Sequence, residues 1–594
     1  MEDSGPKRYR QRKACDLCHQ KKIRCDRQKP ACETCHLAGE RCIFSVWQPS
    51  SRHTLQGQLA DAKARIRALE GTIAFRPSWT GDCAGKNYFQ SPFDLNVAID
   101  TFQWYIQYCW PGVANSLPRN AFHSAVYLQT GAVFDLQHFL QEARQTFMSQ
   151  NAFYTVPQKQ KVIPQWPKVA LVQRCIDYFI IKGLYSIFSV VDPEALQTLI
   201  AKRTLEYTEG SSRASDWACL AAFTALIVRL HPHEFALIYT DPDAYIQAAL
   251  MLLPDLLMET ANVRTLEAVL LLTLYFLPSG QPQKAERFLS IAVRIVYNLG
   301  GNRVTPPRET ETDPRKHSHL RALFWHCYAI DKDMSLRKCE PPLMHDIDCD
   351  LDLPPNYVPS SDEQFFKKPL SPDKLIFPSD LRLTLIKARI YHFLYSNHGR
   401  AQPQATQLRY IRELDQEMSD LMADFPAGCR PDVLAIENAP DALFHDLGTR
   451  GVALHLEYYF CLGRVHEASS ACGMPSTHSW SAVPSSVELY HEAARSTLLY
   501  TRRVPHIFPC HTFWIHAQVL LTAVLNLFWY LIQYPTAQSF CADLEILEHI
   551  RQMFIGLIRT GDSARPFPPF YITEAFIGTL IGLAKRSLAR ATGK

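Results

Sequence analysis

Six cysteines near the N-terminus carry the clearest chemistry in this 594-residue chain. Gaps of two, six, six, two and six residues separate them: Cys15, Cys18, Cys25, Cys32, Cys35 and Cys42. The spacing uses one C-x2-C-x6-C unit twice, joined by a six-residue loop. Cysteines two residues apart are typical of metal sites, and thiolate is among the ligands that zinc prefers. The pattern therefore predicts a zinc site built from thiolates.

The number of cysteines indicates two zinc ions that share ligands. Zinc takes four ligands in a tetrahedron, so six thiolates are too many for one ion and too few for two separate sites. If two thiolates bridge, each ion receives four sulfurs. The repeat nominates the first cysteine of each half, Cys15 and Cys32, as the bridges. Six thiolates and two divalent ions leave about two negative charges, which nearby Lys and Arg would offset.

A disulfide framework is the alternative interpretation of the six cysteines. The N-terminus has no apolar signal segment, and cysteine pairs inside the cell usually bind metal rather than oxidise. The other twelve cysteines form no C-x2-C pair. We interpret them as reduced thiols of a protein core.

The positive charge of the chain is concentrated around the cysteines. Residues 1–42 contain eleven Lys and Arg against six Asp and Glu, a net charge of +5. The remaining residues contain 51 basic and 52 acidic side chains. A short basic module on a nearly neutral body is the charge distribution of a nucleic-acid-binding protein.

The cysteine segment resembles the fungal binuclear zinc cluster, the Zn2Cys6 DNA-binding domain of fungal transcription factors. The similarity includes Asp16 after the first cysteine, the basic run 21–24, Asp26 after the third cysteine and Pro30. His19 is a departure, because the family usually has a basic residue at this place. The change weakens one expected DNA contact and leaves the metal ligands intact.

The resemblance implies a way of reading DNA. A short helix from Asp16 to Lys22 is expected to enter the major groove. Lys21 and Lys22 are the candidates for base contact, because lysine can donate to O6 and N7 of guanine. The family implies CGG triplets, with Lys22 as the main reader. The residues expected to bind phosphate, and so to make affinity depend on salt, are Lys13, Arg24, Arg27 and Lys29.

The segments that flank the cluster are predicted to support DNA binding. Residues 1–14 form a basic flexible arm for phosphate contact or nuclear import, and residues 43–54 form a linker. Apolar residues then recur at heptad spacing over 55–76, which predicts a short coiled coil: Leu55, Leu59, Ala62, Ile66, Leu69 and Ile73. We expect this element to make a homodimer; the alternative is a surface helix packed on its own body. Residues 77–92 form a second linker.

Residues 93–594 are predicted to form one large helical domain, so the fold class is mainly α. Residues 511–532 lack Lys, Arg, Asp and Glu and are long enough to span a bilayer, but their polar residues favour a buried helix. Apolar periodicity predicts helices near 94–109, 168–182, 214–230, 242–252, 266–277, 282–299, 316–337, 380–397, 404–423, 441–466, 486–503, 512–533 and 541–559.

Two stretches of the body resemble the regulatory, or middle homology, domain of fungal transcription factors. Residues 266–303 contain its A-V-R and L-G pattern, at 292–294 and 299–300. Residues 321–354 are similar to a second signature of that domain, with Cys339-Glu340 in place of the usual Gly-Arg. The resemblance implies regulatory surfaces, with co-regulators or transcription machinery and a small-molecule effector as further partners.

Enzyme motifs are missing from the sequence. It contains no G-x-S-x-G elbow, P-loop or dinucleotide-binding glycine fingerprint in a suitable context. The aspartates of 346–352 alternate along what we expect to be an extended acidic loop rather than a metal site. Residues 411–425 mix acids and apolar residues, and we predict an amphipathic helix there rather than an activation segment.

We therefore predict a nuclear, zinc-dependent transcription factor of RNA polymerase II genes that binds double-stranded DNA. A pathway-specific regulator of a secondary-metabolite gene cluster is the favoured assignment. Regulation of nutrient use or of stress and drug resistance is one alternative. An interaction scaffold whose zinc cluster does not bind specific DNA is another.

Overall fold

The computed structural model divides the chain into two compact units, Met1–Ala84 and Gly85–Lys594. The residues that it describes are 14–44, 93–109, 119–151, 154, 164–201, 213–231, 241–304, 313–359, 365, 374–434, 448–469, 484–561 and 566–593. Lys13, residues 45–54 of the first linker, the second linker and the predicted coiled coil, with its heptad residues between Leu55 and Ile73, lie outside these ranges.

The backbone of the first unit shows the same twofold repeat as its cysteine sequence. Helix α1 (Asp16–Gln20) and helix α2 (Glu33–Leu37) each begin directly after the first cysteine of their half. Both end in the same way, with a left-handed residue: Lys22 at φ 54° and Gly39 at φ 62°. The Ile23 N–H then donates to the Cys18 carbonyl, and the Glu40 N–H to the Cys35 carbonyl, each at 3.0 Å.

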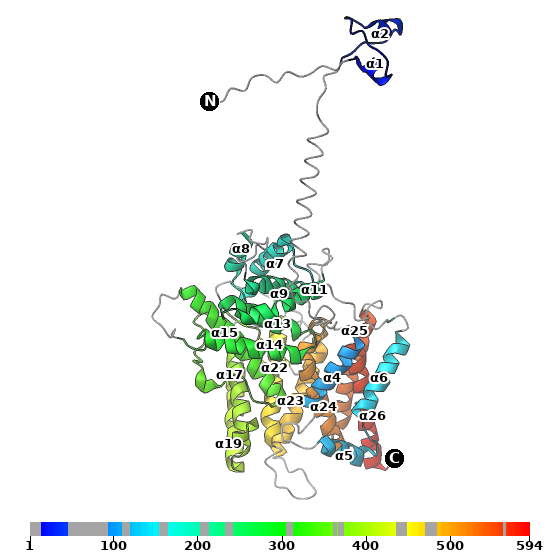
Figure 1. Cartoon of the computed structure of the whole chain (residues 1–594). Helices are drawn as coiled ribbons and strands as arrows, with labels where there is room; N and C mark the ends of the chain where they lie inside the picture. The colour runs from blue at the N-terminus through cyan, green and yellow to red at the C-terminus, as the bar shows by residue number, and fades with distance from the viewer. Residues whose placement is uncertain are drawn as a thin grey trace. The chain divides into compact units, whose positions relative to one another are not determined.

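The second unit is built from helices (Figure 1). They are α4 (Leu95–Cys109), α5 (Arg119–Thr130), α6 (Leu136–Gln150), α7 (Val169–Ile181), α8 (Pro193–Ala201), α9 (Ala214–Leu230), α11 (Pro242–Met251), α12 (Leu253–Met258), α13 (Val263–Phe276), α14 (Pro282–Asn298), α15 (Pro314–Lys338), α17 (Leu381–Ile390), α18 (Asn397–Arg400), α19 (Gln404–Ala423), α20 (Pro431–Leu434), α22 (Thr449–Glu467), α23 (Pro484–Arg503), α24 (Phe513–Gln533), α25 (Phe540–Thr560) and α26 (Pro568–Thr592). The described residues contain no strand, only one isolated bridge between Tyr357 and Leu375. The mainly α fold class is confirmed.

Helices α9, α11, α13 and α14 pack in series: α11 packs on α9, α9 on α13, and α13 on α14. Helix α14 shows why the chain folds in this way. Pro282 occupies its first turn, where the missing N–H costs nothing, and Gly300 follows its end at φ 73°. Its apolar stripe, including Phe288 and Val296, is buried. The predicted helix over 282–299 is confirmed.

The two ends of the second unit pack together. Helix α4 contacts α24 and α26, and α6 contacts α26, although these helices lie over 400 residues apart (Figure 1). The Tyr105 ring stacks on Trp514 with centroids 5.5 Å apart. The Thr101 hydroxyl donates to the Gly280 carbonyl at 2.6 Å. These contacts join the first helix of the unit to its centre and to its last helices.

The long apolar segment forms a core helix. Helix α24 has the length and composition of a membrane span, but 83% of its most apolar window is buried inside the fold. It packs against α4, α22, α23, α25 and α26. The predicted burial of residues 511–532 is confirmed.

Some predictions differ from the structure. Helices α5, α6, α8 and α26 were not expected. The expected helix 380–397 ends at Ile390, and a π-helical turn leads to Ser396, whose hydroxyl caps α18 by accepting the Gly399 N–H at 3.0 Å. The acidic run is not fully extended: Asp346–Asp348 form a 3-10 turn, and the Asp346 carboxylate accepts a hydrogen bond from the Tyr328 hydroxyl at 2.8 Å. Helix α19 over 404–423 confirms the predicted amphipathic helix.

Candidate metal centre and nucleic-acid interface

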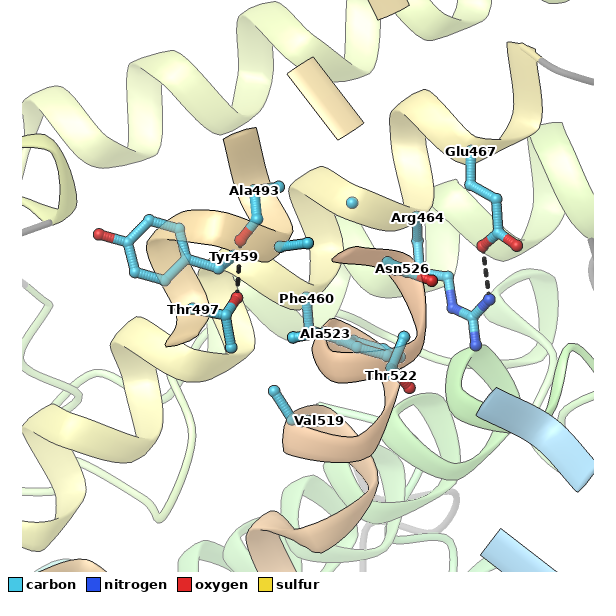
Figure 2. Close-up of a pocket in the computed structure, with 12 residues that line it drawn as sticks. Tyr459, Phe460, Arg464, Glu467, Ala493, Thr497, Val519, Thr522, Ala523 and Asn526 are labelled. Atoms are coloured by element: carbon cyan, nitrogen blue, oxygen red, sulfur yellow. Dashed lines mark hydrogen bonds and ion pairs between the residues drawn. The ribbon is translucent and has the colours of Figure 1, made fainter. Parts of the chain in front are cut away.

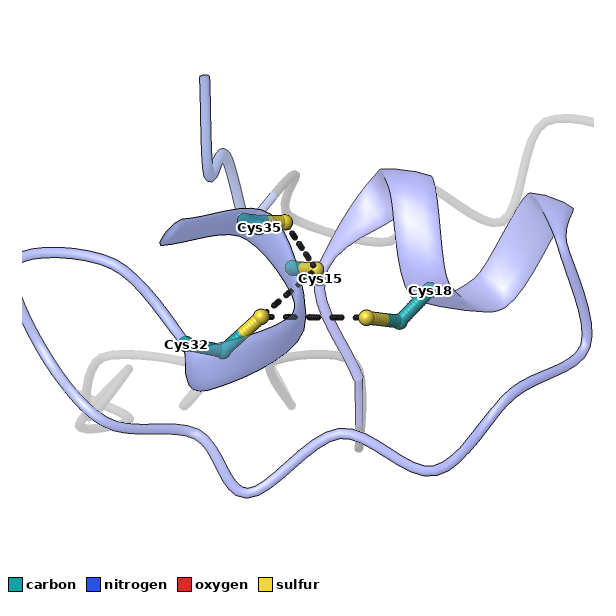
Figure 3. Close-up of side chains that lie close together, drawn as sticks. All are labelled: Cys15, Cys18, Cys32 and Cys35. Carbon is teal, nitrogen blue, oxygen red and sulfur yellow. Dashed lines mark hydrogen bonds between the residues drawn. The ribbon is translucent and has the colours of Figure 1, made fainter. Parts of the chain in front are cut away.

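The cysteine sulfurs of the first unit form a compact donor set (Figure 3). Those of Cys15, Cys18, Cys32 and Cys35 lie within 4.8 Å of one another, and all four side chains are buried. The Cys15 sulfur lies 3.5 Å from that of Cys35 and 3.7 Å from that of Cys32, and the Cys18 and Cys32 sulfurs are 3.7 Å apart. A tetrahedral zinc with Zn–S bonds of about 2.3 Å separates its sulfurs by about 3.8 Å. The donor set fits zinc.

Cys15 and Cys32 lie at the centre of this set. Each approaches a sulfur of the other half of the repeat, and the two approach each other. The Cys25 sulfur lies within 4.8 Å of the Cys32 sulfur, and the Cys42 sulfur accepts the Cys32 N–H at 3.4 Å. All six predicted ligands are therefore gathered around the two residues nominated as bridges.

The sulfurs are too far apart for disulfides, and those of Cys18 and Cys35 do not ionise readily without a cation. All six cysteines are unpaired, and the closest sulfurs stand well beyond the S–S bond length of about 2.05 Å. Burial, followed by the neighbouring sulfurs of Cys15 and Cys32, raises the pKa of Cys18 to about 12. The same causes raise the pKa of Cys35. A divalent cation supplies the charge that such thiolates need.

The predicted DNA-contacting residues that the structure describes are all exposed: Lys21, Lys22, Arg24, Arg27 and Lys29. The first two follow the end of α1, and the others lie on the segment that leads to α2. The corresponding end of α2 carries Ala38 and Gly39. The two lysines therefore have no counterpart in the second half, whose exposed arginine, Arg41, lies at the position equivalent to Arg24.

Lys22 and Arg27 adopt backbone conformations that favour glycine, with φ values of 54° and 64°. A left-handed conformation costs a residue with a Cβ about 1–2 kcal/mol. At the position equivalent to Lys22, the second half has Gly39. The fold thus needs a left-handed residue at both places, and the first half retains a lysine despite the strain. The left-handed conformation of Lys22 can be predicted from the sequence only when the two halves are aligned, because Gly39 then stands at the equivalent position.

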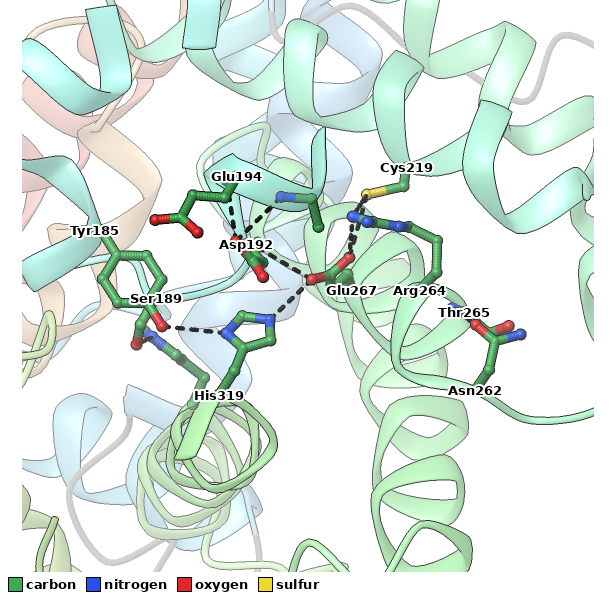
Figure 4. A network of polar contacts seen from close by, with 12 residues as sticks. Tyr185, Ser189, Asp192, Glu194, Cys219, Asn262, Arg264, Thr265, Glu267 and His319 are labelled. Carbon is green, nitrogen blue, oxygen red and sulfur yellow. Dashed lines mark hydrogen bonds and ion pairs between the residues drawn. The ribbon is translucent and has the colours of Figure 1, made fainter. Parts of the chain in front are cut away.

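A buried polar network lies in the second unit (Figure 4). The Glu267 carboxylate, 1% exposed, pairs with Arg264 at 2.5 Å and contacts His319 Nε2 at 2.8 Å. It also accepts the Asp192 N–H at 3.2 Å, and His319 Nδ1 lies 3.2 Å from the Tyr185 hydroxyl. Helices α13 and α15 are thereby joined to the segment before α8. The network connects these elements of the fold. An acidic residue within the apolar run of α13 was the sequence feature that could have predicted it.

A pocket between α22, α23 and α24 was also absent from the predictions (Figure 2). Its lining includes Phe460, Val519, Ala523 and Arg464, and Arg464 donates to Glu467 at 2.6 Å. The cavity holds about 20 Å³, which is room for about one water molecule. The predicted small-molecule effector gains no support from this pocket.

Comparison with known families identifies two regions. Residues 13–52 match the Fungal Zn(2)-Cys(6) binuclear cluster domain, and residues 211–421 match the Fungal specific transcription factor domain. The first match covers all six cysteines, and the second runs from the start of α9 to within α19.

Curated relatives carry names of transcription factors. The "ABC-transporter-regulating transcription factor" of Aspergillus oryzae is 25% identical over 337 residues, which is 53% of this chain and 36% of the relative. The protein of the same name from Aspergillus fumigatus gives the same values. The "Fusaridione A cluster transcription factor fsdR" of Fusarium heterosporum is 24% identical over 318 residues, 52% of this chain and 58% of the relative. The chain thus matches about a third of the length of the Aspergillus relatives.

Proposed function

We propose that this chain is a nuclear, sequence-specific regulator of RNA polymerase II genes. The proposal starts from the chain's matches to both the fungal Zn(2)-Cys(6) cluster domain and the fungal specific transcription factor domain. The observation that carries the proposal is the buried set of cysteine sulfurs beside the exposed lysines at the end of α1. A metal cluster would fix the helix, and the lysines would meet DNA.

Two zinc ions occupy the cluster, with Cys15 and Cys32 shared between them. Cys18 and Cys25 complete the tetrahedron of one ion, and Cys35 and Cys42 complete the other. The central position of the two bridges supports this assignment. Zinc binding supplies the folding energy of a module this small, at about 10 kcal/mol or more for a structural site. Replacement of Cys32 by Ala should release zinc and abolish specific binding.

Helix α1 enters the major groove, where Lys22 and Lys21 contact the bases of a CGG triplet. The exposure of both lysines and the retained strain at Lys22 support this role. Lys13, Arg24, Arg27 and Lys29 bind phosphate, so affinity falls as salt rises.

A homodimer reads two such triplets. The domain plan is a basic arm (1–14), the zinc cluster (15–42), a linker (43–54), a coiled coil (55–76), a second linker (77–92) and a helical regulatory domain (93–594) that meets co-regulators. Replacement of Leu59, Ile66 and Leu69 by Asp should leave a monomer that binds single triplets weakly. An unchanged dimer mass would place the dimer contact elsewhere.

The names of the relatives favour two kinds of target. The relative from Fusarium heterosporum is named for the fusaridione A cluster, and its match covers the larger share of the relative. We assign this chain to a secondary-metabolite gene cluster on that basis. The Aspergillus relatives are named for ABC-transporter regulation, which favours drug or stress resistance as the alternative. Regulation of nutrient use is a further alternative.

Selection of random duplex DNA by the zinc-loaded protein tests the proposal. Recovery of paired CGG triplets at one spacing is the expected result. Recovery of single triplets would support sequence-specific DNA binding and contradict the proposed dimer. A folded, zinc-loaded protein that enriches no sequence at low salt would instead be an interaction scaffold, the role that His19 in place of a basic residue favours.

A further inference from the structure

The two halves of the zinc cluster are joined by hydrogen bonds at equivalent positions: the first residue of each helix bonds to a residue of the other half. Residues of one half correspond to residues 17 positions later, as Cys15 does to Cys32. The Asp16 N–H, at the start of α1, donates to the Ile43 carbonyl at 2.9 Å. The Glu33 N–H, at the start of α2, donates to the Asp26 carboxylate, at 3.2 Å to Oδ1 and 3.3 Å to Oδ2. Asp26 and Ile43 each follow the third cysteine of their half.

Neither helix has a side-chain cap of its own. The residue before each helix is a cysteine, Cys15 or Cys32, and neither makes a capping hydrogen bond. Helix N-termini are usually capped by a side-chain oxygen at that position, which satisfies an N–H that has no partner within the helix. A cysteine that binds metal directs its sulfur to the cluster instead. Asp26 supplies the missing acceptor for α2 from seven residues upstream.

The acceptor of α2 also lies beside the cluster. An Asp26 carboxylate oxygen is within 4.8 Å of the Cys25 and Cys32 sulfurs. Its hydrogen bond holds the residue directly after Cys32. It therefore controls where the α2 backbone, and with it the central sulfur, is placed. In the first half, the equivalent acceptor is the backbone carbonyl of Ile43, which a side-chain substitution leaves in place.

The charge of Asp26 opposes the cluster rather than attracting it. Six thiolates and two divalent ions already leave about two negative charges, and a carboxylate adds another. The useful property of Asp26 is therefore its oxygen acceptor, which asparagine also has. We propose that Asp26 is a positioning residue that orients Cys32 and α2 for zinc, an inference that rests on the proposed zinc cluster.

The test is a competition titration of zinc from the full-length protein with a chelator. D26A should weaken the binding of zinc by about 10-fold, the usual size of effect when a group that orients a metal ligand is removed. D26N should restore the affinity to that of the unsubstituted protein. E40A removes another exposed acid of the same module and serves as the control for charge; it should leave the affinity unchanged. The thermal unfolding of the helical domain should not change in any variant.

Two results would overturn the inference while leaving the proposed zinc cluster intact. Equal affinities for D26A and the unsubstituted protein would show that the hydrogen bond does not position the site. An equal loss in D26A and D26N would show that the carboxylate acts by its charge or as a ligand. If the unsubstituted protein bound no zinc, the proposed function would fail, and the inference would fail with it.

Discussion

Replacement of Lys22 by glycine should separate the folding of the zinc module from its reading of DNA. Lys22 has a φ of 54°, and its equivalent, Gly39, has a φ of 62°. Glycine would relieve about 1–2 kcal/mol of backbone strain. Glycine would also lower the free energy of unfolding by about 0.5–1 kcal/mol, because it makes the unfolded chain more flexible. Lys22→Gly should therefore be as stable as the original protein or more stable, by up to about 1.5 kcal/mol.

The same change should weaken DNA binding. Loss of one base contact costs about 1–3 kcal/mol, or roughly 5-fold to 150-fold in affinity for the CGG triplet. Lys22→Ala should lose the same affinity but keep the strain, because alanine retains a Cβ. The glycine variant should then be the more stable of the two while binding DNA equally weakly.

Fluorescence anisotropy with a CGG duplex and a scrambled duplex at fixed salt measures the affinities, and zinc-loaded unfolding measures the stabilities. Arg24→Ala is the control for a phosphate contact. It should weaken binding to both duplexes alike and reduce the salt slope by about one. Equal losses of Lys22→Gly on both duplexes would refute base reading at this position. A glycine variant less stable than the alanine variant would refute the strain argument.

Three further predictions concern the helical domain. Lys387 is 1% exposed and pairs with Asp333 at 2.7 Å and Glu457 at 2.9 Å. Lys387→Met should cost about 3–5 kcal/mol in urea unfolding, because it removes the buried cation that the two acids share. Asp333 would then keep its pair with Arg337, and Glu457 its hydrogen bond from Ser379. The control Arg409→Met removes an exposed pair with Glu413 and should cost under about 0.5 kcal/mol; similar costs would contradict the argument. Gly280 has a φ of 70°, and a Cβ there would meet the Trp514 ring at 2.5 Å, so Gly280→Ala should destabilise by about 2–5 kcal/mol. Gly582→Ala has open space and should be neutral or stabilising; equal Tm shifts would refute the steric reason. Burial lowers the pKa values of His455 and His516 to about 4; folded values below the unfolded value of about 6.5 mean that stability present above pH 6.5 falls as the pH drops towards 4. A urea midpoint that stays constant from about pH 7.5 to about pH 5 would contradict this prediction.

The buried ion pairs show where sequence reasoning stops. Apolar periodicity predicted α14 and α24 well, because each helix faces a core along one stripe or all round. It did not predict α26, which begins with two prolines and ends in a basic segment although one face of the helix is buried. The partners of Lys387 come from α15 and α22, 54 and 70 residues away, so no local pattern indicates them.

The chemistry of the N-terminal module follows from local features of the sequence. Ligand type and spacing are local properties, so six cysteines in a repeated unit already predict shared zinc ions. The groups that support this module, and the contacts that hold the helical domain together, are visible only in the folded chain. The Asp26 carboxylate lies at the start of α2, and in the helical domain Thr101 bonds to Gly280 across 179 residues. Such contacts depend on how distant segments pack, and the packing is set by the whole folded chain.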